Sequence, residues 1–462
     1  MTTKGTLKYL LLTAVFLPLQ PPQSLAQQST ASPSPLPETT KIAPAVSGMP
    51  QDPLSQLATS ETPSRPLYGV QGVLVETLQG STVAVQNHEQ TFNPASAIKL
   101  ATALIALRNL GPKHRFTTGI WTDGTLDRPT GTIVGNLYIS GRDPSLHYEH
   151  AIDIAHQLNT LGIRTVTGDL VVSTEFTLNF NWSSLRSGEN FYDTLDVQLR
   201  PPAETRAWLD SRAARGTNTP VGAVPSVAVM GEVSVGPVAA VAKLLLTHQS
   251  SSLPDILKVL LCYSNNFMAE RLGESLGGVQ SVRRQLISQL KIPEDQIHLS
   301  SLSGLGINRM SPQAMMKVFR ALRQEVRKVG LSLSDIMPVA GIDPGTLQDR
   351  FVSTPWKGSV IAKTGTLVRT DGGVSSLVGQ MRTSSGEVLL FVIMNQRGNV
   401  LRFRDNQDFF VMQVQNSRGG PKPFNYSPQT LALKLGKTRS KVVLPDEYEP
   451  DMSIPSAAPK FD

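Results

Sequence analysis

Ser96 and Lys99 form the first group of residues in this sequence whose types and spacing could do covalent chemistry. Side chains three residues apart on a helix lie on one face, where a lysine amine can take the proton of an attacking serine. Residues 96–110 carry leucine and alanine at helical spacing and stop at Gly111. We therefore expect Ser96 at a helix start, where unpaired N–H groups favour negative charge. Alone, the pair is explained better by a capping serine and a surface lysine.

A second polar cluster, Ser264-Asn265-Asn266, falls between two stretches of helical pattern, residues 254–263 and 267–276. At such a junction a hydroxyl could relay a proton and an amide could hold a substrate. Ordinary helix caps would account for the same residues.

A third cluster, Lys363-Thr364-Gly365-Thr366, follows a strand-like run at residues 358–362. A glycine beside a lysine lets the backbone of a ligand approach a strand edge closely, although a turn would explain it too. In this order, the three clusters match the Ser-x-x-Lys, Ser-x-Asn and Lys-Thr-Gly motifs of penicillin-recognising enzymes. Dismissing them requires three separate coincidences, so we interpret them as one site.

The wider sequence resembles the low-molecular-mass class C penicillin-binding proteins, the serine-type D-alanyl-D-alanine carboxypeptidase/endopeptidase family. The resemblance is carried by FNPASAIKLATALIALRNLG, by MPVAGIDPGTLQDRF, by IAKTGTL, and by GRDPSL at residues 141–146, which is similar to a GDPTL-type signature. Three features depart from the pattern. Asn265 stands where aspartate is usual, residues 301–305 read SLSGL where DGSGL is typical, and residues 178–236 match little. These departures leave endopeptidase activity and substrate range open.

The resemblance implies an α+β fold, in which an antiparallel sheet flanked by helices, with a helical subdomain, is interrupted by a smaller inserted α/β domain. The strand and helix patterns agree with this order, because a hairpin and helix come first, helices dominate residues 254–329, and two long strands follow. The expected segments are a signal peptide at 1–26, a linker at 27–66, a catalytic domain at 67–110 and 239–425, an inserted domain at 111–238, and a tail at 426–462. Within the insertion we expect strands at 134–139, 165–170 and 226–230 and a helix at 152–161.

The resemblance also implies acyl transfer on peptidoglycan peptides that end in D-Ala-D-Ala. Ser96 would attack the penultimate D-Ala carbonyl, and Lys99 would act as the base after burial and the charge of Lys363 lower its pKa. Ser264 would relay the proton to the leaving amine, and Asn266 would hold the substrate and orient Lys99. β-Lactam antibiotics would be covalent inhibitors.

The substrate-binding edge is also implied by the family. The backbone N–H groups of Ser96 and Thr366 would form the oxyanion hole. Thr364, Thr366 and the charge of Lys363 would receive the terminal carboxylate, and Gly365 would permit the close approach. No metal and no cofactor is expected to take part.

Two other functions stay open. A β-lactamase would share the nucleophile but needs an activator for the hydrolytic water, and Glu270, near the second motif, is the unassigned candidate. A non-catalytic wall-binding protein could retain the fold, but intact Ser96, Lys99 and Lys363 argue against it.

Composition narrows the partners and the compartment. The net charge of +7 is spread along the chain without an arginine-rich run, which argues against nucleic acid. Two lysines, an apolar run at residues 9–19 and Ser24-Leu25-Ala26 predict a secretory signal, hence a periplasmic or extracytoplasmic protein. That run is too short for a bilayer of ~30 Å, and no later run approaches ~18 apolar residues, so no stable membrane span is expected.

Cysteine and histidine are two further residue types that could form a site. Cys262 is the single cysteine and lies in an apolar stretch, which favours a buried structural thiol. His147, His150 and His156 cluster in HYEHAIDIAH, where a solvated helix face is a simpler interpretation than a metal site.

Overall fold

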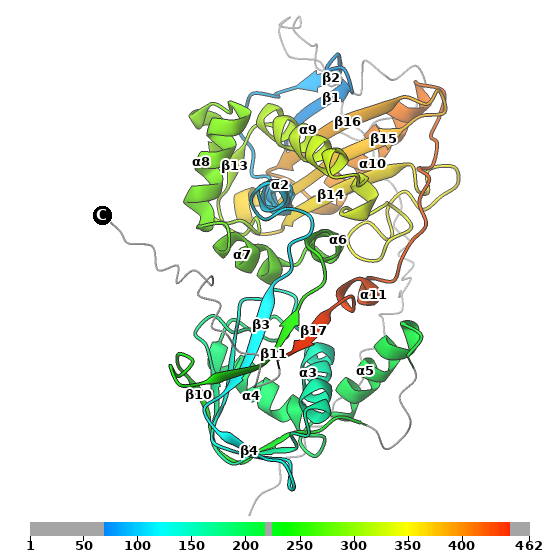
Figure 1. The fold of residues 1–462 in the computed structure, drawn as a ribbon. Coiled ribbons are helices and arrows are strands. Elements are labelled where there is room, and N and C mark those ends of the chain that lie inside the picture. The colour runs from blue at the N-terminus through cyan, green and yellow to red at the C-terminus, as the bar shows by residue number, and fades with distance from the viewer. Residues whose placement is uncertain (1–68, 218–223, 444–462) are drawn as a thin grey trace, which may run out of the picture. The chain divides into compact units, whose positions relative to one another are not determined.

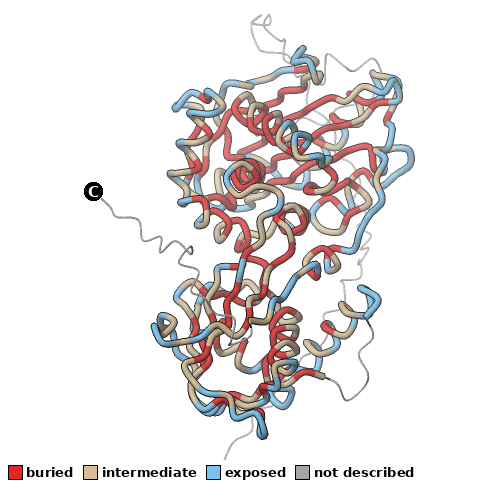
Figure 2. Tube along the Cα trace, in the orientation of Figure 1, coloured by how far each residue is buried: buried red, intermediate tan, exposed pale blue. Residues whose placement is uncertain are grey.

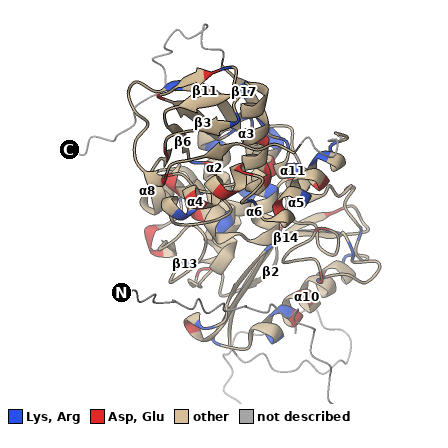
Figure 3. Cartoon of the chain, turned by 90° about the horizontal axis from the view of Figure 1, so that it is seen from below, with Lys and Arg blue, Asp and Glu red and all other residues tan. Residues whose placement is uncertain are grey.

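A computed structural model of the chain describes residues 69–217 and 224–443 (Figure 1). These residues belong to one compact unit, Pro50–Asp462, and a second unit is Met1–Met49. The expected signal peptide (1–26) and linker (27–66) lie outside the described residues. No helix in the described part combines the length and the hydropathy needed to cross a bilayer. Basic and acidic residues are interspersed over the helices and loops (Figure 3).

A five-stranded antiparallel sheet carries the third motif on one of its edges. Its strand order is β14-β15-β16-β1-β2, so β14 is an edge strand. The strands are β1 (Val70–Thr77), β2 (Thr82–Gln86), β14 (Val360–Leu367), β15 (Val374–Arg382) and β16 (Val388–Gln396). The first two strands and the last two agree with the hairpin and the closing strands expected from the sequence.

Both faces of this sheet are covered, because side chains alternate between two cores along each strand. In β16, Leu390, Val392 and Met394 belong to the core of the helical side, whereas their neighbours pack against α10 (Val400–Asn416) on the other side. The helices on the first side are α2 (Lys99–Leu110), α6 (Leu253–Tyr263), α7 (Asn266–Glu274), α8 (Gly278–Leu290) and α9 (Pro312–Lys328).

Helix α2 runs through the centre of that first core. Every residue from Lys99 to Leu107 is buried, and the tube in Figure 2 is red along this helix. A helix that is enclosed on all sides carries even its polar side chains into the interior. This is how the sequence brings a lysine amine into a buried position.

The region between α2 and α6 forms a second set of sheets. A six-stranded sheet has the order β10-β8-β6-β3-β11-β17, and a four-stranded sheet has the order β4-β5-β7-β9. The elements are β3 (Thr117–Thr122), β4 (Thr125–Asp127), β5 (Thr132–Val134), β6 (Leu137–Gly141), α3 (Tyr148–Thr160), β7 (Thr165–Val166), β8 (Leu170–Val172), α4 (Ser184–Leu195), α5 (Pro202–Ala214), β9 (Ala228–Val229), β10 (Val233–Val235) and β11 (Lys243–Gln249). A separate two-stranded ladder joins β12 (Ile297–His298) to β13 (Arg309–Met310).

The chain passes from the four-stranded to the six-stranded sheet at Gly135, Gly168 and Gly231. The N–H of Gly168 donates to the carbonyl of Gly135 at 2.9 Å, and that of Gly231 to the carbonyl of Gly168 at 3.0 Å. A Cβ on either donor would lie 2.6 Å from the accepting oxygen, so only glycine fits these stacked corners. The prediction of single strands at residues 134–139 and 165–170 is therefore wrong in this detail, because each range is divided between two sheets.

The ordered region also extends beyond the expected domain limits. β11 follows residue 238 yet belongs to the six-stranded sheet, and α11 (Leu431–Leu435) and β17 (Arg439–Val442) lie in the expected tail. β17 pairs with β11, so residues up to 442 are structured, while residues from 444 lie outside the described part. The division into two domains stays a prediction.

Candidate active site

Ser96 and Lys99 are in direct contact. Ser96 lies on a 3₁₀ turn, Ala95–Ile98, that leads into α2, rather than on the first turn of the α-helix itself. The expected contact still forms, because residues three apart are eclipsed in a 3₁₀ helix. Lys99 Nζ donates to Ser96 Oγ at 2.9 Å.

The Lys99 amine is held by two further groups. It donates to Asn266 Oδ1 at 2.7 Å and to the backbone carbonyl of Ser303, which also accepts from Ser96 Oγ at 3.2 Å. Burial lowers the pKa of Lys99 to about 7, against an opposing effect of the Glu270 charge. The amine is therefore largely unprotonated just above neutral pH, as a base for Ser96 must be.

The second motif is formed where α6 ends and α7 begins. Ser264 ends α6 in the left-handed region, with φ of 55°. Asn265 caps α7 by accepting from the backbone N–H of Met268 at 2.9 Å, so an asparagine serves here as an aspartate cap would. Asn266 is the first residue of α7, and its side chain reaches Lys99.

The third motif lies within β14 rather than after a strand. Lys363 Nζ donates to Ser264 Oγ at 2.8 Å and to the carbonyl of Thr364 at 2.6 Å. Strand alternation places Lys363 and Gly365 on the face toward α2, and Thr364 and Thr366 on the opposite face. The motifs that are far apart in sequence thus meet at this edge.

The charge relation between the two lysines differs from the expected one. Burial, not the charge of Lys363, is the main cause of the lowered pKa of Lys99. The pKa of Lys363 is itself lowered well below its usual value, by burial first and by Lys99 second. We therefore correct the expectation that Lys363 is the cation that activates Lys99.

Two glycines let separate segments pack against the backbone just before Ser96. A Cβ on Gly304, at φ of 92°, would lie 2.1 Å from the carbonyl oxygen of Ala95. A Cβ on Gly365 would lie 2.5 Å from the carbonyl oxygen of Pro94. The altered SLSGL element therefore keeps the one residue that the close approach requires.

Glu270, the candidate water activator, is bonded to a loop backbone. Its carboxylate accepts from the N–H groups of Ser303 at 2.8 Å and Leu302 at 3.2 Å. The same loop supplies the Ser303 carbonyl to Lys99. Glu270 thus positions the loop that holds the amine.

A cavity of about 310 Å³ opens beside Ser96. It is lined by Ser96, Ser264, Asn266, Thr346, Thr364, Thr366 and Arg404. Five of the eight residues expected at the site line this cavity, and Lys99, Lys363 and Gly365 do not. No motif indicated Thr346 or Arg404, although Thr346 falls in the family-like GIDPGTLQDRF stretch.

Behind the cavity, Lys258 and Asp343 form an ion pair at 2.6 Å with both side chains fully buried. Lys258 also donates to two backbone carbonyls, and Tyr426 donates to the other Asp343 oxygen at 2.6 Å. The pair joins α6, which ends at Ser264, to the loop that carries Thr346. It is a support for the site that no motif indicated.

We expect Lys258→Met to lower the free energy of unfolding by about 3–5 kcal/mol, because the Asp343 carboxylate is left buried without its cation. Urea unfolding followed by circular dichroism measures this loss. The double variant Lys258→Met/Asp343→Leu should recover part of the stability, because the buried charge is gone although Tyr426 and the Val339 N–H lose their acceptor. Equal losses in the single and double variants would contradict this account.

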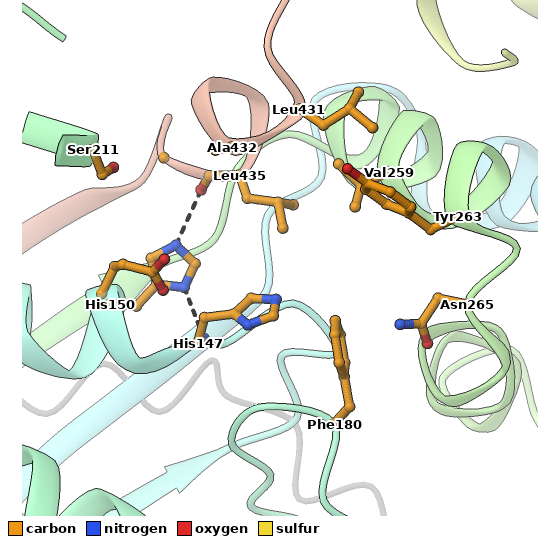
Figure 4. A pocket seen from close by; sticks show the side chains of 12 residues that line it. His147, His150, Phe180, Ser211, Val259, Tyr263, Asn265, Leu431, Ala432 and Leu435 are labelled. Atoms are coloured by element: carbon orange, nitrogen blue, oxygen red, sulfur yellow. Dashed lines mark hydrogen bonds between the residues drawn. The ribbon is translucent and has the colours of Figure 1, made fainter. Parts of the chain in front are cut away.

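A second pocket of about 300 Å³ is lined by Tyr263 and Asn265, the two neighbours of Ser264 in the sequence, and by His147 and His150 (Figure 4). His150 is buried, and its Nε2 forms a hydrogen bond with the carbonyl of Leu435 at 3.1 Å. The prediction of a solvated helix face is therefore wrong for this histidine. Among the described residues, no group of three potential metal ligands occurs.

Cys262, next to the second motif, is buried, as expected. Burial raises the pKa of its thiol to about 12, which leaves it unreactive. Its carbonyl accepts from the N–H of Thr346 at 3.0 Å.

Comparison with known proteins gives one family and several relatives. The sequence pattern described as the D-Ala-D-Ala carboxypeptidase 3 (S13) family matches residues 60–185 and 224–413. A D-alanyl-D-alanine carboxypeptidase from Actinomadura sp. (strain R39) is 28% identical over 423 residues, covering 70% of this chain and 77% of the relative. The D-alanyl-D-alanine carboxypeptidase DacB of Haemophilus influenzae is 24% identical over 404 residues, covering 68% and 82%.

Among solved structures, the penicillin G-acylated form of a predatory endopeptidase from Bdellovibrio bacteriovorus matches with a TM-score of 0.67. It is 23% identical, and the match covers 78% of this chain and 96% of that one. This likeness concerns the fold.

Proposed function

Because the chain belongs to the D-Ala-D-Ala carboxypeptidase 3 (S13) family, we propose that it removes the terminal D-Ala from peptidoglycan stem peptides through an acyl-enzyme on Ser96. The observation that carries this proposal is the buried Lys99 amine, held 2.9 Å from Ser96 Oγ with a pKa of about 7. A serine with a neutral base in contact is an activated nucleophile.

Family membership confirms the resemblance, and with it the enzyme class expected from the sequence. The chain is a serine-type D-Ala-D-Ala carboxypeptidase. The solved relatives confirm the α+β fold class of the penicillin-binding proteins.

In the proposed acylation step, Ser96 Oγ bonds to the penultimate D-Ala carbonyl carbon while its proton passes to Lys99 Nζ. The C–N bond to the terminal D-Ala then breaks, and its amine takes up the proton from Lys99, relayed through Ser264. Water hydrolyses the resulting ester and frees the peptide. Asn266 keeps the amine aimed at Ser96.

The edge of β14 supports the proposed oxyanion hole. The N–H of Ala362 donates outward, away from β15, to the carbonyl of Pro338 at 3.3 Å. Because N–H directions alternate along a strand, the N–H groups of Thr364 and Thr366 point to the same outer edge. We assign the N–H of Thr366, together with that of Ser96, to the developing oxyanion.

The compartment and the inhibitors follow from the same function. Peptidoglycan lies outside the cytoplasmic membrane, so the proposal includes export by the signal at residues 1–26. β-Lactams are proposed as covalent inhibitors because they would acylate Ser96 as the peptide does. The penicillin G-acylated relative supports this part.

A β-lactamase is a weaker alternative. Among the described residues that line the cavity there is no aspartate or glutamate. The carboxylate of Glu270 already accepts hydrogen bonds from the N–H groups of Leu302 and Ser303. Without a carboxylate to activate water, a penicilloyl ester should persist. An intact Ser96–Lys99 pair also disfavours a purely wall-binding role.

The test is D-Ala release from an acylated Lys-D-Ala-D-Ala peptide by the purified chain. We expect the chain to release D-Ala, and we expect one equivalent of benzylpenicillin per active site to stop this release. Rapid turnover of benzylpenicillin with no D-Ala release would favour the β-lactamase, and inertness toward both would overturn the proposal.

We expect acylation to depend on pH through Lys99. The amine accepts the Ser96 proton only when it is itself unprotonated, so the rate should rise about tenfold per pH unit below 7 and level off above. The second-order rate of acylation by benzylpenicillin, measured from pH 5 to 9, gives this profile. A flat profile across this range would contradict the role of Lys99.

A further inference from the structure

Arg404 brings a guanidinium to the cavity from α10, on the side of the sheet opposite α2. Its Nη2 donates to Thr366 Oγ1 at 2.9 Å, and it lines the cavity together with Ser96. Because Thr366 Oγ1 accepts this bond, its own hydroxyl hydrogen is free to donate to a ligand. The two side chains therefore offer adjacent donors at the end of the Lys363–Thr366 motif.

Among the described residues, the Asp408 carboxylate acts on the charge of Arg404 from a distance, without forming an ion pair with it. Asp408, one helical turn away, is engaged by Arg350, whose Nε and Nη2 lie 2.9 and 2.5 Å from Asp408 Oδ1. In the part of the chain that the structure describes, Arg404 forms no ion pair. A half-buried arginine without a carboxylate, at a cavity wall, is suited to an anionic ligand.

Among the described residues that line the cavity, Arg404 is the one that carries a positive charge. Apart from Arg404, the described residues that line the cavity are five hydroxyls and the Asn266 amide. Lys99 and Lys363 do not line the cavity, and their amines are already bonded to Asn266, Ser264 and backbone carbonyls. An arginine stays charged in the folded protein.

We propose that Arg404 binds the C-terminal α-carboxylate of the peptide, together with Thr364 and Thr366, and thereby selects substrates with a free C-terminus. This inference rests on the proposed function and deepens it. A planar fork of N–H donors matches a carboxylate, whereas it gains little from a neutral amide at the same place. The enzyme then favours removal of a terminal residue over cleavage within a cross-link.

The test compares one acylated Lys-D-Ala-D-Ala peptide with its C-terminal amide in wild type, Arg404→Met and Arg404→Lys. We expect Arg404→Met to lower kcat/KM for the free acid about 10- to 100-fold, the loss typical of a charged hydrogen bond, and to leave the amide nearly unchanged. Arg404→Lys should recover part of the loss. Arg402→Met, exposed on the same helix, is the matched control and should behave as wild type.

Equal losses for acid and amide would mean that Arg404 only supports Thr366, and would overturn the inference, as would no loss for either. If wild type cleaves neither peptide, the proposed function fails by itself. Acylation by benzylpenicillin and by its methyl ester then still tests Arg404, because these differ in the same carboxylate. Loss of discrimination between them in Arg404→Met supports the inference, and retained discrimination overturns it.

Discussion

Replacing Ser96 by alanine is expected to lower D-Ala release by about 10⁴- to 10⁶-fold, because the variant has no oxygen to carry the acyl group. The side chain is small and its turn is held by neighbouring backbone, so the fold should persist. Release from the acylated Lys-D-Ala-D-Ala peptide measures the effect.

Ser288→Ala is the matched control for this variant. Ser288 is exposed on α8 and makes one bond, to the carbonyl of Gln285 at 3.3 Å. Its replacement should leave release unchanged. A Ser96→Ala variant that releases D-Ala at the wild-type rate would show that another group is the nucleophile.

Replacing Lys99 by methionine is expected to slow acylation by about 10²- to 10⁴-fold, the usual contribution of a positioned general base. Methionine has a similar length and no amine, so Ser96 loses its proton acceptor while the core stays filled. The rate of benzylpenicillin acylation measures the loss.

The pH profile separates a base from a merely structural residue. In Lys99→Met the rise in rate below pH 7 should disappear, whereas a packing defect would lower the rate at every pH alike. Lys328→Met, with a side chain 77% exposed on α9, is the control. If the acylation rate of Lys99→Met still rose with pH below 7 as in wild type, another group would be the base.

The order of three motifs was enough to predict which distant residues meet. The sequence places Ser96, Ser264 and Lys363 on different elements, and the structure joins them through Lys99–Asn266 and Lys363–Ser264 contacts. Residue type and spacing could not show which cause lowers the pKa of Lys99, since that depends on burial in three dimensions.

Arg404 was missed although a signal for its helix exists. Phe403, Phe410, Val411 and Val414 recur at helical spacing and are buried, and the last three pack α10 against the sheet. That pattern places Arg404 beside the buried stripe but does not say that it reaches Thr366. The contact depends on how α10 crosses β14, which no local pattern contains.

β17 shows a different limit. Residues 439–442 read RSKV, without the apolar alternation that predicts a strand. They form one because β11 offers a free edge almost 200 residues earlier, with Leu246 opposite Val442. The pairing is long-range, so an interpretation based on composition predicts a tail.

The most direct measurement for the central claim locates the covalent adduct itself. After incubation with benzylpenicillin, intact-mass analysis should show one penicilloyl group, and peptide mapping should place it on Ser96. No adduct should form in Ser96→Ala, whereas Ser288→Ala should be labelled as wild type. A penicilloyl group mapped to any other residue, or full labelling of Ser96→Ala, would contradict the account.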